Sequence, residues 1–349
     1  MTGSTPQEHR KPLLTIAIPT YNRSRYLREL LQSLLDDLHG ESRIELIVSD
    51  NASPDETPQL IEEFRNRGLQ FRYIRNETNI GADANFLQCF EQARGKYVWL
   101  VGDDDIIIPG GIAKILKLLE TGDYSIVYMS HYEFRSSHVN EKSSDKLGRV
   151  AEILPDGLSV VRRVGAMITF ISVMIANKED FSTTYHPDLR DFVGTNLMQL
   201  GWICPLLAGS KKNLFVWERL VAGRAGNCSG WGAGQIFGVN LKRVAEQAFG
   251  DRSDLAAELC NRTLRDWFPG TIMGSRRGTG DRLLPENLRE VLEPIYEANF
   301  RYWIYVYPLI TQPLVMAAGW YSIVKFLNRI IRVVSRLSDY LFLRKRFLG

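Results

Sequence analysis

The stretch KYVWLVGDDD, residues 96–105, places three consecutive carboxylates directly after an apolar run with the pattern of a buried strand. Neighbouring carboxylates repel one another, and a hard divalent cation is a common reason to bring them together because such ions prefer oxygen ligands. Parallel sheets bind ligands at the carboxyl ends of their strands. On these residues alone, a solvated acidic turn is an equally good interpretation.

The first 125 residues alternate strand and helix patterns with short connections. The strand patterns cover residues 13–19, 44–48, 70–75 and 96–101, and the helix patterns cover 25–38, 58–67, 83–94 and 111–120. This alternation predicts an α/β fold built from βαβ units, with a mostly parallel sheet. Beyond residue 124 we expect strands at 125–129 and 214–221, and helices at 158–164, 191–206, 235–249 and 253–267.

Composition predicts an ordinary globular protein. The 349 residues are 45% hydrophobic and 24% charged, which suits one large domain with an appendage or two domains. Residues 1–12 are polar and predict a flexible N-terminus without a secretory signal. The cysteines, which lack metal-ligand spacing, are interpreted as reduced thiols of a cytoplasmic protein; they are Cys89, Cys204, Cys228 and Cys260.

The C-terminal region, residues 251–349, is expected to be helical and to associate with a membrane through residues 302–349. Residues 302–324 carry no charged side chain and are long enough to span a bilayer, although Pro308, Pro313 and Gly319 disfavour a straight helix. After them, basic residues fall on one helix face and apolar residues fill the others; the basic residues are Lys325, Arg329, Arg332 and Arg336. A helical hairpin packed on the body and a homo-oligomer interface are the alternatives, and the apolar content argues against nucleic-acid binding.

Polar turns follow the other strands of the first half. They read PTYNR (residues 19–23), SDNASPDET (49–57) and NETNIGADAN (76–85). Backbone N–H groups at a strand-to-helix turn can bind phosphates. Asp50 stands where a carboxylate can accept hydrogen bonds from a base or a ribose, and Gly81 suits a turn that needs positive φ.

In their order and spacing these motifs resemble family 2 glycosyltransferases with the nucleotide-sugar-binding fold called GT-A, and within that family bacterial O-antigen enzymes such as abequosyltransferases. The resemblance covers about residues 13–128. It implies one GT-A domain over residues 13–250, with a nucleotide-binding half (13–128) and an acceptor half (129–250). The nucleotide-sugar-binding residues that it implies are Pro19, Thr20, Tyr21, Asn22, Asp50, Asn79, Gly81, Asn85 and Asp103.

The resemblance also implies a Mn²⁺ or Mg²⁺ ion on the donor diphosphate, held by Asp103, Asp104 and Asp105. Alignment through residues 106–109 places Gly102 where the family's first aspartate usually stands, and the alternative register uses Asp103 and Asp105 as the pair. Asp104 or Asp105 is therefore the first choice for a direct metal ligand, and Asp103 is the better candidate for contact with ribose or a metal-bound water.

The catalytic base is the point at which the sequence departs from the family. Family members generally invert the anomeric centre and use an aspartate from a Glu-Asp pair downstream as the base. Thr195 and Asn196 stand at these positions here, and neither side chain is a base at neutral pH. We take Asp191 as the candidate base, with an N-cap as its structural interpretation, and Asp180 as the alternative.

The sequence therefore predicts an inverting, metal-dependent glycosyltransferase. Its donor would be a nucleotide-diphosphate sugar, and its acceptor a glycan, expected to be polyprenyl-linked, that belongs to O-antigen, lipopolysaccharide or another surface polysaccharide. It would act peripherally on the inner face of the plasma membrane. The alternative is a non-catalytic sugar-nucleotide-binding or scaffold subunit of a glycan-assembly complex. A nucleotidyltransferase is disfavoured because the first turn, PTYNRSRY, contains no glycine.

Overall fold

A computed structural model describes residues 11–141, 150–184, 186–226, 232–279 and 286–347, with side chains described as far as residue 330. The chain forms two compact units. The first comprises residues 1–227 and 240–260, and the second comprises 228–239 and 261–349. Most of the expected flexible N-terminus, residues 1–12, lies outside the described residues, as does Cys228, whereas Cys89, Cys204 and Cys260 are buried thiols.

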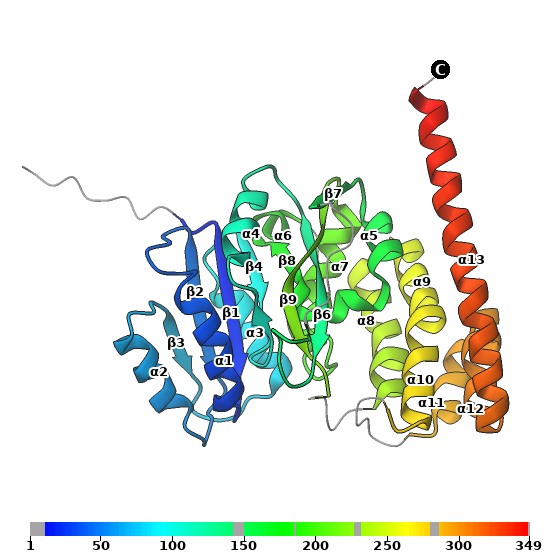
Figure 1. The fold of residues 1–349 in the computed structure, drawn as a ribbon, viewed down its shortest axis with the longest axis horizontal. Helices are drawn as coiled ribbons and strands as arrows, with labels where there is room; N and C mark the ends of the chain where they lie inside the picture. Colours follow the sequence, from blue (N-terminus) through cyan, green and yellow to red (C-terminus); the bar gives the residue numbers. More distant parts are fainter. Residues whose placement is uncertain (1–10, 142–149, 185, 227–231, 280–285, 348–349) are drawn as a thin grey trace, which may run out of the picture. The chain divides into compact units, whose positions relative to one another are not determined.

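The first unit contains four parallel strands in the order β3-β2-β1-β4 (Figure 1). Their bounds are Leu14–Thr20 for β1, Ile44–Asp50 for β2, Arg72–Arg75 for β3 and Tyr97–Leu100 for β4. All seven residues of β1 are buried, as expected for a parallel strand covered on both faces. The predicted α/β fold is confirmed, and the carboxyl ends of β1, β2, β3 and β4 lie on one edge of the sheet.

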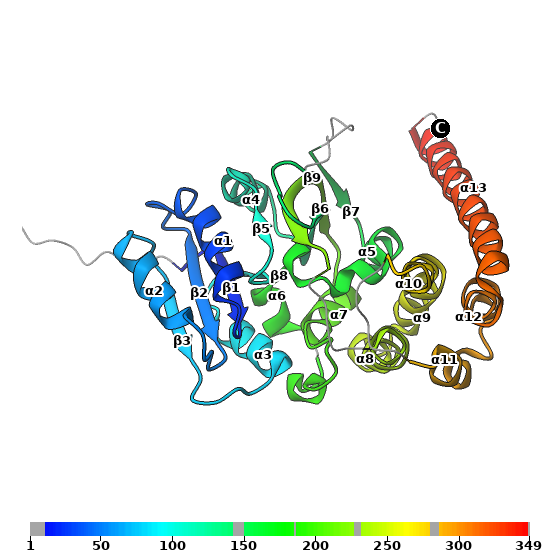
Figure 2. The same ribbon diagram turned by 60° about the horizontal axis from the view of Figure 1, so that its bottom comes forward.

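Helices lie on both faces of these strands (Figure 2). The helices between the strands are α1 (Ser24–Leu35), α2 (Thr57–Asn66) and α3 (Ala82–Gln92), and α4 (Gly111–Leu119) follows β4. One buried cluster joins Ile16 and Trp99 to apolar residues of α1, α2 and α4, including Leu30 and Phe64. Each such side chain contributes about 1.5–3 kcal/mol relative to an exposed position. This packing fixes the strands that carry the polar turns.

The remaining strands turn the parallel half into a nine-stranded mixed sheet. β8 (Met174–Asn177) is antiparallel to both β4 and β6 (Ile126–Phe134), and β9 (Asn213–Arg224) is parallel to β6. Two short strands, β5 (Ile106–Ile107) and β7 (Ala151–Leu154), are antiparallel to β9. The pairing of β5 with β9 brings β9, which lies more than a hundred residues downstream, next to the acidic turn.

The helices between β6 and residue 262 are short. They are α5 (Gly157–Val164), α6 (Lys178–Thr183), α7 (Leu200–Gly209), α8 (Leu241–Phe249) and α9 (Ser253–Arg262), with 3-10 turns η1 (Gly165–Thr169), η2 (Ile171–Val173) and η3 (Leu189–Phe192). The prediction of one helix over residues 191–206 is wrong between η3 and α7, where the chain forms turns. Gly194 has a φ of 86° and Asn196 a φ of 58°, values that a right-handed helix excludes.

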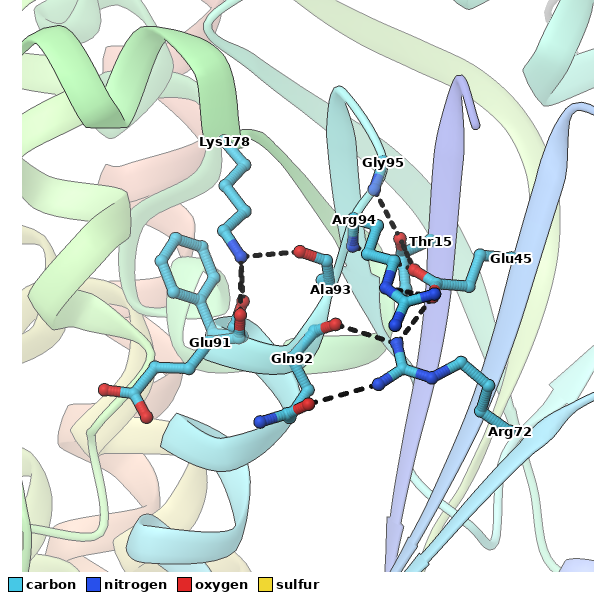
Figure 3. A network of polar contacts seen from close by, with 10 residues as sticks. Thr15, Glu45, Arg72, Glu91, Gln92, Ala93, Arg94, Gly95 and Lys178 are labelled. Carbon is cyan, nitrogen blue, oxygen red and sulfur yellow. Dashed lines mark hydrogen bonds and ion pairs between the residues drawn. The ribbon is translucent and has the colours of Figure 1, made fainter. Parts of the chain in front are cut away.

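A polar network closes the opposite edge of the sheet, where the parallel strands begin (Figure 3). Glu45 accepts hydrogen bonds from Thr15 Oγ1 at 2.7 Å and Arg72 Nη1 at 2.7 Å. The Nζ atom of Lys178 donates to the carbonyl oxygens of Phe90, Glu91 and Ala93 at 2.7, 2.9 and 2.6 Å. Lys178 therefore caps the C-terminus of α3. The N-terminus of the same helix lies at the carboxyl ends of the parallel strands.

The second unit is helical, as predicted. Its elements are η4 (Gln235–Asn240), η5 (Thr263–Trp267), α10 (Phe268–Arg276), α11 (Leu288–Tyr296), η6 (Tyr302–Val306), α12 (Tyr307–Thr311) and α13 (Leu314–Phe347). The uncharged stretch 302–324 is interrupted at Gln312 and Pro313, between α12 and α13. Over the part of the chain that the structure describes, every helix is too short or too polar to cross a membrane.

Candidate active site

The acidic turn, Gly102 to Asp105, directly follows β4 and is held by two distant residues. Ser172 Oγ accepts a hydrogen bond from Gly102 N at 2.8 Å and donates one to Asp105 Oδ2 at 2.5 Å. The backbone N–H of Arg224, on β9, donates to Asp105 Oδ1 at 2.9 Å. Both oxygens of this buried carboxylate are therefore engaged in shaping the turn.

Glycine at position 102 follows from the same geometry. A Cβ atom at Gly102 would lie 3.0 Å from Asp105 Oδ2 and 3.2 Å from Asp104 Oδ1. The two carboxylates fold back over the place where a larger residue would put its side chain. A side chain at position 102 would therefore require these two carboxylates to shift by a few tenths of an ångström, whereas glycine leaves them in place.

The other two acids of the turn face Arg23, on the first polar turn. Arg23 Nη1 lies 3.0 Å from Asp103 Oδ1, and Arg23 Nη2 donates to Asp104 Oδ2 at 2.8 Å. Thr20 Oγ1 donates to Asp103 Oδ2 at 2.7 Å. The side chain of Asp104 is 17% exposed and that of Asp103 is 3% exposed, so Asp104 is the more accessible carboxylate.

Burial sets the electrostatics of this turn. It raises the pKa of Asp103 and of Asp105 above the ordinary range of aspartate. Arg23 opposes this effect at Asp103, because its positive charge favours the ionised carboxylate. Among the residues whose placement is described, no three His, Cys, Asp or Glu side chains are arranged to enclose a metal ion. An ion here would therefore need further oxygen ligands, such as those of a diphosphate.

The second polar turn is organised around Asp50. This carboxylate is fully buried, and it accepts hydrogen bonds from Tyr73 Oη at 2.6 Å and Ser53 N at 2.8 Å. Arg75 Nε lies 3.4 Å from it. Burial and the hydrogen bond to Asp50 raise the pKa of Tyr73. Ser53 Oγ in turn accepts from Asn22 N at 2.9 Å, so the first two polar turns are joined.

The third polar turn is tied to the second. Asn51 Nδ2 donates to Asn79 Oδ1 at 2.7 Å, and the same oxygen accepts from Gly81 N at 2.9 Å. Gly81 has a φ of 89°, which confirms the expected positive φ at this position. Asn85 is buried and exchanges hydrogen bonds with Ser49, at 2.6 Å and 3.0 Å. Asn79 and Asn85 therefore link the third polar turn to the C-terminal end of β2.

The structure thus brings the predicted nucleotide-sugar-binding residues of four turns to one edge. Pro19 and Thr20 end β1 and are buried, whereas the side chain of Tyr21 is 42% exposed beside them. The residues that the sequence prediction missed are Arg23, Tyr73, Arg75, Asp83, Ser172 and Arg224. Arg23 stands within the PTYNR motif and Asp83 within NETNIGADAN, whereas the other four lie outside the quoted motifs.

The turn around Thr195 and Asn196, where the resemblance leads us to expect two acids, contacts a carboxylate from another element. Asp83, in the first turn of α3, accepts a hydrogen bond from Asn196 N at 2.8 Å. Burial raises the pKa of Asp83, while the backbone N–H groups of Asn196, Gly194, Met198 and Thr195 lower it. Asn240 Nδ2 donates to the carbonyl oxygen of Thr195 at 2.9 Å. Residues 194–198 therefore wrap around the Asp83 carboxylate.

The two predicted bases lie elsewhere. Asp191 is exposed at the end of η3 and accepts a hydrogen bond from Gln247 Nε2 at 3.2 Å. Asn240, which contacts the carbonyl oxygen of Thr195, precedes Gln247 by seven residues, which is about 10 Å along a helix. The contact that Asp191 makes is therefore separate from the contact at Thr195. Asp180 accepts from Ser125 Oγ at 3.0 Å, just after β8. The last residue of β8, Asn177, pairs with Tyr97, the first residue of β4, so the structure places Asp180 at the edge opposite the acidic turn.

Comparison with known proteins agrees with this geometry. Residues 15–172 match the model of glycosyl transferase family 2. Abequosyltransferase RfbV of Salmonella typhimurium is 31% identical over 190 residues, which are 50% of this chain and 56% of that protein. Poly(ribitol-phosphate) beta-N-acetylglucosaminyltransferase TarS of Staphylococcus aureus is 35% identical over 94 residues, which are 27% of this chain and 16% of TarS. The matches thus span about half of one curated relative and a small part of the other.

A solved structure shows that the likeness extends to the fold of both units. The crystal structure of S. aureus TarS 1–349 in complex with UDP-GlcNAc has a TM-score of 0.56 and 16% sequence identity, over 90% of this chain and 91% of that one. At this identity the likeness establishes a shared fold. Together with the family match and the four polar turns on one sheet edge, it confirms the resemblance expected from the sequence. The match to glycosyl transferase family 2 covers residues 15–172, a little under half of the chain.

Proposed function

We propose that this protein transfers a sugar from a nucleotide-diphosphate donor to the hydroxyl group of a glycan acceptor. The observation that carries the proposal is the carboxyl edge of β1, β2, β3 and β4, where hydrogen bonds join the polar turns to one another and Arg23 binds two acids of the acidic turn. The names of RfbV and TarS, and the UDP-GlcNAc in a TarS structure, support a hexosyl or deoxyhexosyl donor.

The acidic turn suits a Mn²⁺ or Mg²⁺ ion. A guanidinium group already lies between Asp103 and Asp104, so positive charge is stabilised at this place. Asp104, the more accessible acid, would be the principal protein ligand, with Asp103 beside it. Asp105 would keep the turn in shape through Ser172 and Arg224. When bound, such an ion would neutralise negative charge on the leaving nucleoside diphosphate.

The transfer also requires a group that accepts the proton of the acceptor hydroxyl while its oxygen bonds to the anomeric carbon. In an inverting reaction the bond between that carbon and the diphosphate oxygen breaks at the opposite face. Asp191 remains our candidate from the sequence, and Asp180 the alternative. Asp83 joins them because its carboxylate contacts the turn where the family's acids stand.

The three candidates are separated by Asp83→Asn, Asp191→Asn and Asp180→Asn, each measured for turnover and for donor binding. Loss of turnover with unchanged donor affinity is the result expected for the base. Asp180→Asn is expected to retain turnover, since its carboxylate lies at the opposite edge of the sheet. Retained turnover in the Asp83 and Asp191 variants would mean that neither residue is the base.

The acceptor is proposed to be lipid-linked and to be met at the inner face of the plasma membrane. The first turns of α13 expose large apolar side chains, among them Val315 (85% exposed), Phe326 (64%) and Ile323 (51%). Lys325 and Arg329 are exposed on the same helix, and anionic lipid headgroups attract such cations. Arg332 and Arg336, which were predicted to continue the basic face, lie beyond the described side chains.

Co-sedimentation with vesicles that contain anionic lipid tests this membrane contact. The wild-type protein is expected to sediment with the vesicles, and Phe326→Asp is expected to sediment less. Ser322→Asp, an equal charge change at an exposed polar position of α13, is the control. If the wild-type protein stays in the supernatant and forms a dimer by light scattering, the exposed apolar side chains belong to a homo-oligomer interface instead.

Turnover separates an enzyme from the alternative, a sugar-nucleotide-binding subunit. UDP-, GDP-, dTDP- and CDP-sugars are incubated with the full chain and Mn²⁺, with and without lipid-linked acceptors, and released nucleoside diphosphate is measured. We expect release from at least one donor. Donor binding without release under every condition would support the non-catalytic subunit.

A further inference from the structure

We propose that Arg23 competes with a divalent ion for Asp103 and Asp104, and that the ion displaces the guanidinium group toward the diphosphate of the donor. The inference rests on the proposed function, because it assumes a metal and a nucleoside diphosphate at this edge. It assigns Arg23 a positioning role in which metal and donor assist each other's binding.

The contacts place the guanidinium group where an ion would have to bind. Two different nitrogens of Arg23 reach two different acids, Nη1 to Asp103 at 3.0 Å and Nη2 to Asp104 at 2.8 Å. Asp105 lies behind them and is held by Ser172 and Arg224. The accessible side of the acidic turn is therefore the side that Arg23 covers.

A guanidinium group and a divalent ion cannot share this position. Both are positively charged and repel each other, so an ion bound at Asp104 Oδ2, the oxygen that Arg23 contacts, requires that contact to break. The second arginine of the turn is held differently. Arg224 Nη2 is bound to Glu29 at 2.5 Å, and its Nε donates to the carbonyl oxygen of Asp104 at 3.1 Å. Arg23 is thus the group that moves.

Arg23 is built to move without leaving the site. Its side chain is 34% exposed, and its guanidinium carbon lies 5.3 Å from the centre of the Tyr26 ring. It also stands in the turn that directly follows β1, where backbone N–H groups can meet phosphate oxygens. A diphosphate at this edge would bind the displaced guanidinium group through charged hydrogen bonds.

The competition predicts two effects of opposite sign when Arg23 is replaced by Met. Without a nucleotide, the acids lose their internal cation, and Mn²⁺ should bind more tightly, by about 5- to 150-fold, the usual range for coupling between two ligands. With saturating Mn²⁺, a nucleoside diphosphate should bind more weakly, because one of its cationic partners is gone. General damage to the site would instead weaken both binding steps.

The test uses electron paramagnetic resonance of Mn²⁺ and calorimetry of UDP, GDP, dTDP and CDP on the full chain. Arg28→Met is the matched control, since Arg28 lies on α1, the helix that directly follows Arg23, and pairs with Glu63 at 2.6 Å. Arg23→Lys keeps the positive charge but cannot contact both acids through two nitrogens. Its affinities for Mn²⁺ and for the nucleoside diphosphates should therefore lie between those of the wild type and of Arg23→Met. It also serves as the test variant if Arg23→Met does not fold.

Unchanged or weaker Mn²⁺ binding in the nucleotide-free Arg23 variants would overturn the inference while leaving the proposed function in place, provided that the wild type binds Mn²⁺ with a nucleoside diphosphate. Absence of Mn²⁺ binding from every variant, with and without nucleotide, would overturn both the inference and the proposed metal site.

Discussion

The hydroxyl group of Ser172 donates a hydrogen bond to Asp105 Oδ2 at 2.5 Å, although the two residues are 67 positions apart in the chain. Both side chains are buried. The same hydroxyl oxygen accepts from Gly102 N, so one side chain joins the two ends of the acidic turn. The shape of the turn therefore depends on a residue that is distant in the sequence.

Replacing Ser172 by Ala should destabilise the protein and lower its activity. It leaves the half-buried N–H of Gly102 without this partner and takes one hydrogen bond from a buried carboxylate, a loss of about 1–3 kcal/mol in the free energy of unfolding. Urea unfolding measures the loss, and release of nucleoside diphosphate measures the activity. Ser182→Ala, at an exposed position on α6, is the control. Equal stability of the two variants would contradict the bridging role.

The contact between Asp83 and residues 194–198 predicts an effect on turnover. Asp83→Ala removes the carboxylate around which this turn is folded, and a displacement of about 1 Å at a reacting group can cost about 100-fold in rate. We expect kcat to fall strongly while nucleoside diphosphate affinity changes little. A rise in KM with unchanged kcat would show instead that the turn serves donor binding.

The cap that Lys178 places on α3 predicts a purely structural effect. Lys178→Met removes three hydrogen bonds to helix carbonyls, and we expect the free energy of unfolding to fall by about 1–2 kcal/mol. Because this contact lies at the edge opposite the acidic turn, the activity of the folded variant should match that of the wild type. Lys114→Met, at an exposed ion pair with Glu218, is the comparison.

His131 predicts how stability depends on pH. It lies on β6 with its ring 5.1 Å from that of Phe170, and burial, with a smaller effect of Arg219, lowers its pKa to about 4. The unfolded chain, with an ordinary pKa near 6.5, then binds more protons than the folded protein between these values. Stability should therefore decrease as pH falls from 6.5 to 4, by up to about 3 kcal/mol from this group.

Urea unfolding at pH 7 and pH 5 tests the assignment. His131→Asn should show a smaller loss of stability between the two values than the wild type shows. His39→Asn, at an exposed position, controls for removal of a histidine. An identical pH dependence in His131→Asn and the wild type would contradict the lowered pKa.

Local patterns were enough to predict the strands and helices that carry the polar turns. The apolar run before Gly102 and the spacing of leucines over residues 25–38 are periodic signals that depend on neighbours in the chain. They predicted β4 and α1, and parallel order placed the acidic turn beside Thr20 and Arg23.

The rest of the site depends on pairing between distant segments. Antiparallel β8 brings Ser172 to Asp105, and β9 brings Arg224 there across 119 positions, and neither residue stands in a motif. The helix predicted over residues 191–206 failed because Gly194 and Asn196 adopt positive φ around the carboxylate of Asp83. Periodicity alone cannot reveal such a tertiary contact.

The most direct test of a donor site built around Asp104 is the Mn²⁺ dependence of turnover in Asp104→Asn. Released nucleoside diphosphate is measured against Mn²⁺ concentration for the wild type, for Asp104→Asn and for the control Asp123→Asn, whose exposed carboxylate pairs with Lys96 at the opposite edge. We predict Mn²⁺-dependent release by the wild type and the control, and a loss of at least about 100-fold in Asp104→Asn. Release by Asp104→Asn at the wild-type rate and with the same Mn²⁺ dependence would contradict the account.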